Sequence, residues 1–129
     1  NFEIYQKLAD LFFQQGLINE AIYASENALK YARDDQKVNV LFFLADLYEE
    51  VNEDHALQLY TLIYNNTVNS METRSEAMMK YADLANRKGD RMAAMNAYTK
   101  VIEDAPDSMT VNKARNKLNL MNTVNKPEN

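Results

Sequence analysis

A four-residue pattern, Leu or Tyr followed by Ala, Asp and Leu, occurs three times in this chain of 129 residues. Its copies begin 36 and 37 residues apart, at residues 8–11, 44–47 and 81–84. A second pattern, Ala followed by Ile, Leu or Met, keeps step with it at residues 21–22, 56–57 and 94–95. A period near 36 residues predicts a repeat protein, in which each unit buries its apolar face against its neighbours.

Each repeat is predicted to form two amphipathic helices, because its apolar residues recur with the helical period. The first repeat carries the stripes Tyr5, Leu8, Ala9, Phe12 and Ala21, Ile22, Ser25, Ala28, Leu29. The second carries Leu41, Leu44, Ala45, Tyr48 and Ala56, Tyr60, Ile63, and the third Met78, Tyr81, Ala82, Ala85 and Ala94, Tyr98, Val101, Ile102. A last stripe predicts one further helix with Val111, Ala114, Leu118 and Met121.

Small residues recur where the two helices of a repeat should cross. Two helices approach closely only where a small side chain replaces a bulky one. The expected crossings are Ala9 with Ala21, Ala45 with Ala56, and Ala82 with Ala94.

Turn and capping residues mark the ends of these helices. Gly16 and Gly89 are expected to take left-handed backbone conformations at helix C-termini. The expected N-caps are Asn19, Asp54, Asp90 and the Pro106-Asp107-Ser108 segment. The extra residues of the long period are expected to be absorbed at Asp34–Lys37 and Asn65–Thr73.

The repeats resemble the tetratricopeptide family, whose signature combines a Leu-small pair, an aromatic, a turn Gly, an Ala in the second helix and an exit Pro. The first repeat offers Tyr5, Leu8-Ala9, Phe12, Gly16, Ala21 and Ala28-Leu29, and the third offers Met78, Tyr81-Ala82, Gly89, Ala94, Tyr98 and Pro106. The second repeat departs most, with Asn52 in place of the turn Gly.

The resemblance implies an all-α, right-handed solenoid of three helix pairs and a C-terminal capping helix. Its domain would span residues 1–122, with repeats at about 2–35, 38–70 and 75–108, a capping helix at about 109–122 and a flexible tail at 123–129.

Composition argues against catalysis and against a metal or cofactor site. The chain has no Cys and one His, His55, whereas a zinc site needs three or four ligands. Its two Gly residues stand alone, so no phosphate-binding loop is present. We therefore expect a non-enzymatic protein without cofactors, with His55 in a solvated turn.

Charge and hydropathy limit the partners. The net charge is −5, and most of the acidic excess lies before residue 109, which argues against nucleic acid as a partner. The longest apolar run, residues 40–45, is far too short to cross a membrane. Because the chain begins with Asn1 rather than Met, we expect a processed or expressed segment. The Gly89-Asp90 turn and the Pro106-Asp107-Ser108 exit give a weaker resemblance to bacterial envelope tetratricopeptide proteins, and the compartment stays open between the bacterial cell envelope and the cytoplasm.

The repeated aspartates, Asp10, Asp46 and Asp83, lie about 100° around each helix from the core-facing Ala. Residues at helical spacing share their face, and together they form the candidate partner-binding groove: Gln6, Asp10, Phe13, Gln14, Phe42, Asp46, Glu49, Glu50, Met79, Asp83, Asn86 and Arg87. The resemblance implies that first helices line a concave surface that holds extended peptides. The alternative is that these aspartates are merely solvated.

The predicted function is non-catalytic protein–protein interaction, as a scaffold or adaptor. Its groove would bind a basic or neutral peptide or helix with apolar anchors. The alternative is a structural spacer or self-assembling segment of a larger protein or complex. The basic residues Lys113, Arg115 and Lys117 of the last helix either are solvated or dock into the groove of a neighbouring copy.

Overall fold

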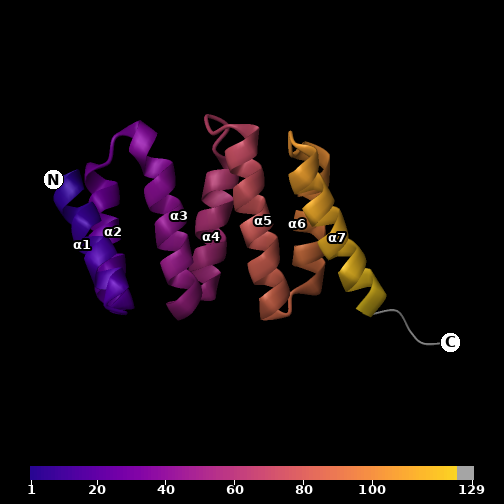
Figure 1. Ribbon diagram of the computed structural model, residues 1–129, viewed down its shortest axis with the longest axis horizontal. Coiled ribbons are helices and arrows are strands. Elements are labelled where there is room, and N and C mark those ends of the chain that lie inside the picture. Colours follow the sequence, from indigo (N-terminus) through magenta and orange to yellow (C-terminus); the bar gives the residue numbers. More distant parts are fainter. Residues whose placement is uncertain (125–129) are drawn as a thin grey trace. The chain divides into compact units, whose positions relative to one another are not determined.

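The computed structural model describes residues 1–124, and within that range the chain is helical and contains no strand (Figure 1). The predicted all-α class is therefore confirmed for the described residues. The helices are α1 (Phe2–Gln14), α2 (Ile18–Tyr31), α3 (Asp34–Val51), α4 (Glu53–Asn65), α5 (Met71–Lys88), α6 (Arg91–Asp104) and α7 (Ser108–Val124). Contacts divide the chain into two units, Asn1–Tyr60 and Thr61–Asn129, which are described in turn.

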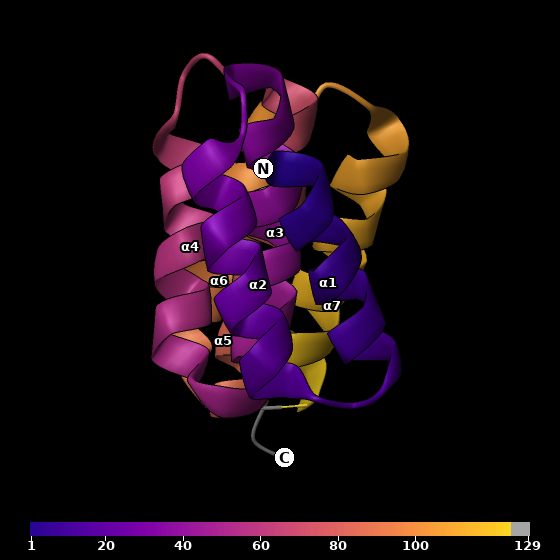
Figure 2. The same cartoon turned by 90° about the vertical axis from the view of Figure 1, so that its left-hand side faces the viewer.

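In the first unit, α1 and α2 form an antiparallel hairpin (Figure 2), and α3 packs against α2. Ala9 and Ala21 are both buried in the hairpin, as their small size predicts. A shared core joins Phe2 of α1 to residues of α2 and α3, and its buried members are Phe2, Ala21, Ile22, Ala28, Val40, Leu44 and Leu47. Ala45 and Ala56, the predicted crossing residues of the second repeat, are also buried.

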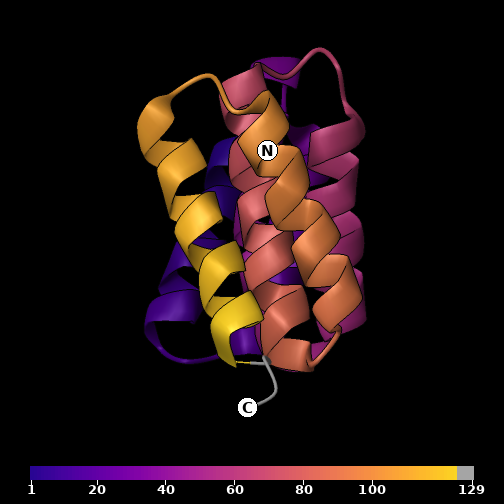
Figure 3. The same ribbon diagram turned by 90° about the vertical axis from the view of Figure 1, so that its right-hand side faces the viewer.

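In the second unit, α6 packs against both α5 and α7 (Figure 3). Ala82, Ala94 and Ala114 are fully buried, so each helix contributes a small residue to this packing. Larger side chains fill the remaining space, among them Met78, Leu84, Tyr98, Val101 and Met121. The stripe predicted for the last helix is thereby confirmed at its two buried residues, Ala114 and Met121.

A cation–aromatic contact links the end of α4 to α5 and α6 in the second unit. The Arg74 guanidinium lies 5.0 Å from the centre of the Tyr64 ring, and its Nε donates a hydrogen bond of 2.6 Å to the Tyr64 carbonyl. The Lys100 ammonium lies 5.7 Å from the same ring. The Tyr64 hydroxyl in turn donates to Asp104 at 3.2 Å.

Several predicted helix ends are confirmed. Gly16 and Gly89 have φ values of +76° and +91°, the left-handed region that only Gly adopts without strain. The Asp90 carboxylate accepts from the Ala93 amide at 3.1 Å, and the Asp107 carboxylate accepts from the Thr110 amide at 2.8 Å. Both are therefore true N-caps.

Two predicted caps are wrong. α2 begins at Ile18, so Asn19 lies inside its first turn rather than at the cap, which is Leu17. α4 begins at Glu53, and the side chain of Asn52 accepts from the His55 amide at 3.1 Å. Asn52 therefore caps this helix instead of Asp54. A one-residue turn after α3 leaves no room for a later start.

The two segments expected to absorb extra residues differ: residues 34–37 all lie in α3, whereas residues 66–70 form the loop between α4 and α5. α3 already begins at Asp34, where the Gln36 side chain accepts from the Arg33 amide at 2.9 Å. α5 begins at Met71, where the Ser70 hydroxyl accepts from the Thr73 amide at 3.1 Å. These caps extend both helices toward their N-termini beyond the predicted repeat boundaries. α7 also runs to Val124, past the predicted end at residue 122, and the rest of the predicted flexible tail lies outside the described residues.

One predicted core residue is exposed. Leu8 of α1 is 36% exposed, whereas Leu44, its equivalent in α3, is 2% exposed. The difference in exposure follows from the neighbouring helices. In the first unit, α2 packs against α3 and covers Leu44, whereas no helix of this unit covers the Leu8 side of α1. An apolar stripe thus predicts where burial is possible, and the adjoining helix decides whether it occurs.

Candidate partner-binding face

The repeated aspartate of the second repeat holds a buried tyrosine. Tyr60 of α4 is fully buried, and its hydroxyl donates to the Asp46 carboxylate at 2.7 Å and to the Glu49 carboxylate at 2.6 Å. Both acceptors lie on α3, one helical turn apart. The pair of carboxylates therefore satisfies the one polar atom that Tyr60 brings into the core.

The third repeat repeats this arrangement and adds a cation. The Tyr98 hydroxyl of α6 donates to the Asp83 carboxylate at 2.5 Å. Lys117 of α7 donates to both oxygens of the same carboxylate, at 2.8 and 2.9 Å. Asp83 thus joins α5, α6 and α7, and Lys117 forms an ion pair within its own chain.

The electrostatics of these contacts keep both tyrosines protonated. Burial raises the pKa of Tyr60 and of Tyr98 well above the ordinary value, and the accepting carboxylates raise both further. A tyrosinate beside a carboxylate would place two negative charges together where water solvates them poorly, which is unfavourable. The tyrosines therefore act as hydrogen-bond donors.

The first repeat lacks such a contact. Ser25 stands four residues after Ala21, as Tyr60 follows Ala56 and Tyr98 follows Ala94. The Ser25 hydroxyl is buried, with no hydrogen-bond partner, and Asp10 is exposed. Among the three repeated aspartates, Asp10 is therefore the one whose carboxylate makes no hydrogen bond to a second-helix tyrosine.

The sequence contained a signal for this pairing, which the repeat analysis missed. The two buried tyrosines recur in register with the second-helix Ala, and they follow the repeated aspartates by 14 and 15 residues. A hydroxyl recurring on an otherwise apolar stripe needs a recurring acceptor, and the repeated aspartate is the nearest candidate.

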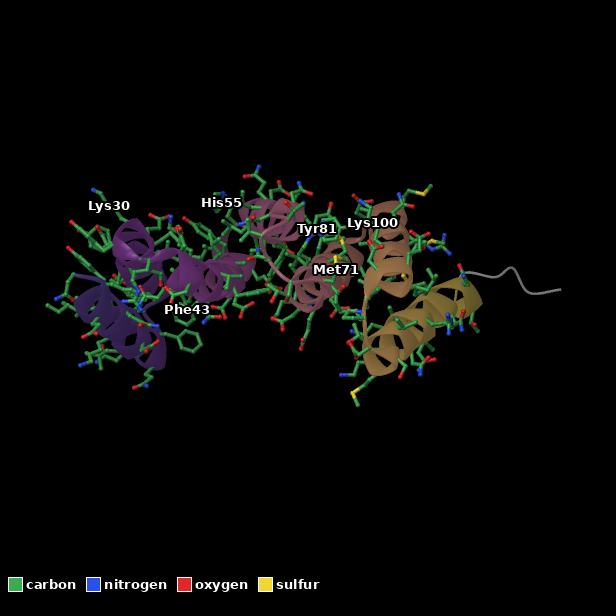
Figure 4. The ribbon with its side chains drawn as sticks, turned by 90° about the horizontal axis from the view of Figure 1, so that it is seen from above. Lys30, Phe43, His55, Met71, Tyr81 and Lys100 are labelled. Atoms are coloured by element: carbon green, nitrogen blue, oxygen red, sulfur yellow. The ribbon has the colours of Figure 1, made fainter. Side chains whose placement is uncertain are left out.

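An aromatic pair lies on the first-helix face of the first unit. The Phe13 ring of α1 meets the Phe43 ring of α3 edge to face, with centroids 5.6 Å apart and an angle of 76° between the planes. The sequence analysis placed Phe42 beside Phe13, but Phe43 makes this contact. Figure 4 shows the Phe43 ring standing off the helix surface. Phe13 remains 48% exposed and presents apolar surface to solvent, whereas Phe43 is half-buried against the core of the first unit.

Phe43 was missed because only the residue four before each aspartate was assigned to the face. Residues three before also share it, since three and four residues apart are both neighbours on a helix. This adds Lys7, Phe43 and Lys80. The face is therefore less acidic than expected. Among the other candidates in the first unit, Phe42 and Glu49 are half-buried. The exposed ones are Gln6, Asp10, Gln14, Asp46 and Glu50.

The second unit brings three candidate residues together around one cavity of about 500 Å³. Asp83, Asn86 and Arg87 line it from α5, and Tyr98 lines it from α6. Lys117, Leu120 and Met121 of α7 complete the lining, although none of them was predicted to take part. Met79 lines a separate hollow of about 410 Å³, which Asp83 and Lys117 also border. Here the charges are mixed rather than acidic.

His55 lies in the first turn of α4 rather than in the solvated turn that was expected. Its ring lies 4.2 Å from that of Tyr48, nearly edge to face, and is half-buried. Tyr48 donates to Glu26 at 2.5 Å, and burial together with that carboxylate raises the pKa of Tyr48 to about 12. Over residues 1–124, no group of His, Asp and Glu side chains is arranged to hold a metal ion.

The sequence matches no known protein family and no curated protein with which it was compared. No helix in the described part of the chain combines the length and apolar character needed to cross a membrane.

Proposed function

We propose that this chain is a non-catalytic interaction module of the tetratricopeptide type, a right-handed solenoid that binds a peptide or helix of a partner along its first helices. The observation that carries the proposal is the pair Phe13 and Phe43, two aromatic rings in contact on α1 and α3 with Phe13 half-exposed. A half-exposed aromatic side chain next to charged residues is a typical anchor of a protein interface.

The expected partner segment is basic or neutral with apolar anchors. Asp10 and Glu50 are exposed carboxylates on the same two helices as the aromatic pair. They would attract cations at a distance and raise the association rate. In the second unit the charges of Asp83 and Lys117 balance each other, so the preference for a basic partner rests on α1 and α3.

A peptide panel tests this function. Fluorescence anisotropy would compare labelled 12-residue peptides that differ in net charge and in the number of large apolar residues. Basic peptides with two apolar anchors should bind most tightly, and rising salt should weaken them. Phe13→Ala combined with Phe43→Ala should reduce affinity at least about tenfold. Gln58→Lys, an exposed change on α4, is the matched control and should leave binding unchanged. Equal binding of all peptides, or loss of binding in the control, would contradict the proposal.

The second candidate function is a structural segment of a larger assembly. It is favoured by a different observation, the exposed apolar stripe of α1 that includes Leu8. In that case binding would use the edge of the first hairpin rather than the aromatic pair.

A further inference from the structure

The outer side of α1 carries an apolar stripe with no cover from its own unit. Ile4, Leu8 and Leu11 follow one another at helical spacing and are 56, 36 and 49% exposed. Tyr23 of α2, 66% exposed, continues the apolar surface across the hairpin. We call these four residues the α1 edge. In Figure 2, α1 and α2 face the viewer, with the rest of the first unit behind them.

The same register positions are buried one repeat later. Val40, Leu44 and Leu47 of α3 stand 36 residues after Ile4, Leu8 and Leu11, and only 5, 2 and 2% of their surface is exposed. They are buried in the core shared with Ala21, Ile22 and Ala28 of α2. The chain thus contains, within its first unit, an example of what covers this stripe: the second helix of a preceding hairpin.

The α1 edge also borders a cavity that a docked side chain could fill. This cavity, of about 350 Å³, has a mostly apolar lining from both helices: Tyr5, Leu8, Phe12, Asn19, Glu20, Tyr23 and Ala24. A cavity of this kind favours an apolar side chain over a charged one.

We propose that the α1 edge docks a further helical hairpin whose second helix presents an α2-like stripe of alanines and a branched aliphatic residue. A second copy of this chain does not offer that stripe, because Ile22 and Ala28 of α2 are 8 and 1% exposed beneath α3. The occupant is therefore a hairpin whose second helix is still open. This surface is separate from the aromatic pair of the proposed function and does not depend on it.

A tandem chain tests the proposal, with residues 1–36 copied directly ahead of the full chain. The 36-residue spacing places the added second helix before α1 as α2 is placed before α3. The amides of the original α1 should exchange at least about tenfold more slowly with deuterium, and the melting temperature should rise by several degrees.

The matched control carries Ile4→Glu and Leu11→Glu in the original copy only. Both residues are exposed in the single-copy chain, so the double variant of that chain should melt at the same temperature as the parent. In the tandem it should abolish the added protection. Unchanged exchange in α1 of the parent tandem would overturn the proposal.

Sedimentation velocity of the single-copy chain tests the alternative occupant, a second copy of this chain. A concentration-dependent dimer that Leu11→Glu abolishes would assign the α1 edge to a second copy and overturn the proposal. Peptide binding at Phe13 and Phe43 should be the same in the parent and in Leu11→Glu. A failure of the peptide experiment alone would therefore leave this inference intact.

Discussion

The buried Tyr60 hydroxyl donates a hydrogen bond of 2.7 Å to Asp46, one of the three aspartates that recur through the sequence. Tyr98 makes the equivalent contact with Asp83. The aspartates were interpreted as partner-binding or merely solvated residues, and two of them have a third role: they hold the second helix of their repeat. A substitution of Asp46 or Asp83 would therefore disturb helix packing as well as any binding, so neither residue tests binding alone.

Tyr60→Phe should destabilise the chain by about 1.5–3 kcal/mol, because the variant leaves two carboxylates without the donor that they share. Urea unfolding followed by circular dichroism measures this. The control is Tyr23→Phe, in which the lost hydroxyl belongs to an exposed side chain. Equal stability of the two variants would show that the hydrogen bonds contribute nothing net.

The raised tyrosine pKa values predict a loss of stability at high pH. Burial raises the pKa of Tyr48 from 10.0 to about 12, and it raises those of Tyr60 and Tyr98 as well. The unfolded chain then loses these protons more readily than the folded chain, so stability is fully present below pH 10 and falls above it. Absorbance at 295 nm should show these tyrosines ionising later than free tyrosine. Titration of all eight tyrosines near pH 10 without unfolding would contradict this.

Ala45→Leu should cost about 1–3 kcal/mol of stability, because Ala45 has no exposed surface and extra methylenes would overpack the α3 core. Thermal melts compare it with Asn39→Leu, which adds Leu at an exposed position of the same helix. If both variants melt like the parent, the small residue is not needed at the predicted crossing.

The helices were predictable because their signal is local. Ala9, Ala21, Ala45, Ala56, Ala82 and Ala94 all lie where their spacing places them, in the core. Leu8 was not predictable, since its burial depends on a neighbour rather than on its own stripe.

The side-chain contacts depend on how one helix is rotated against the next. For that reason Phe43, and not Phe42, meets Phe13, and Lys117 reaches Asp83 from 34 residues away.

Charge changes on the first-helix face should alter association rather than dissociation. Asp46→Lys would also remove one of the two acceptors of Tyr60, so the better probe is Asp10→Lys. With a basic peptide from the panel, Asp10→Lys should slow association and reduce its salt dependence. Phe43→Ala should speed dissociation. Stopped-flow kinetics separates the two rates, with Gln58→Lys as the control.

The most direct test of the binding-face proposal is to map a bound peptide by NMR. Titrating the tightest peptide of the panel into labelled protein should shift amide signals of α1 and α3, centred on Phe13 and Phe43. Signals around Gln58 on α4 should stay in place. Shifts centred on α2 and α4, with Phe13 and Phe43 unaffected, would contradict the account.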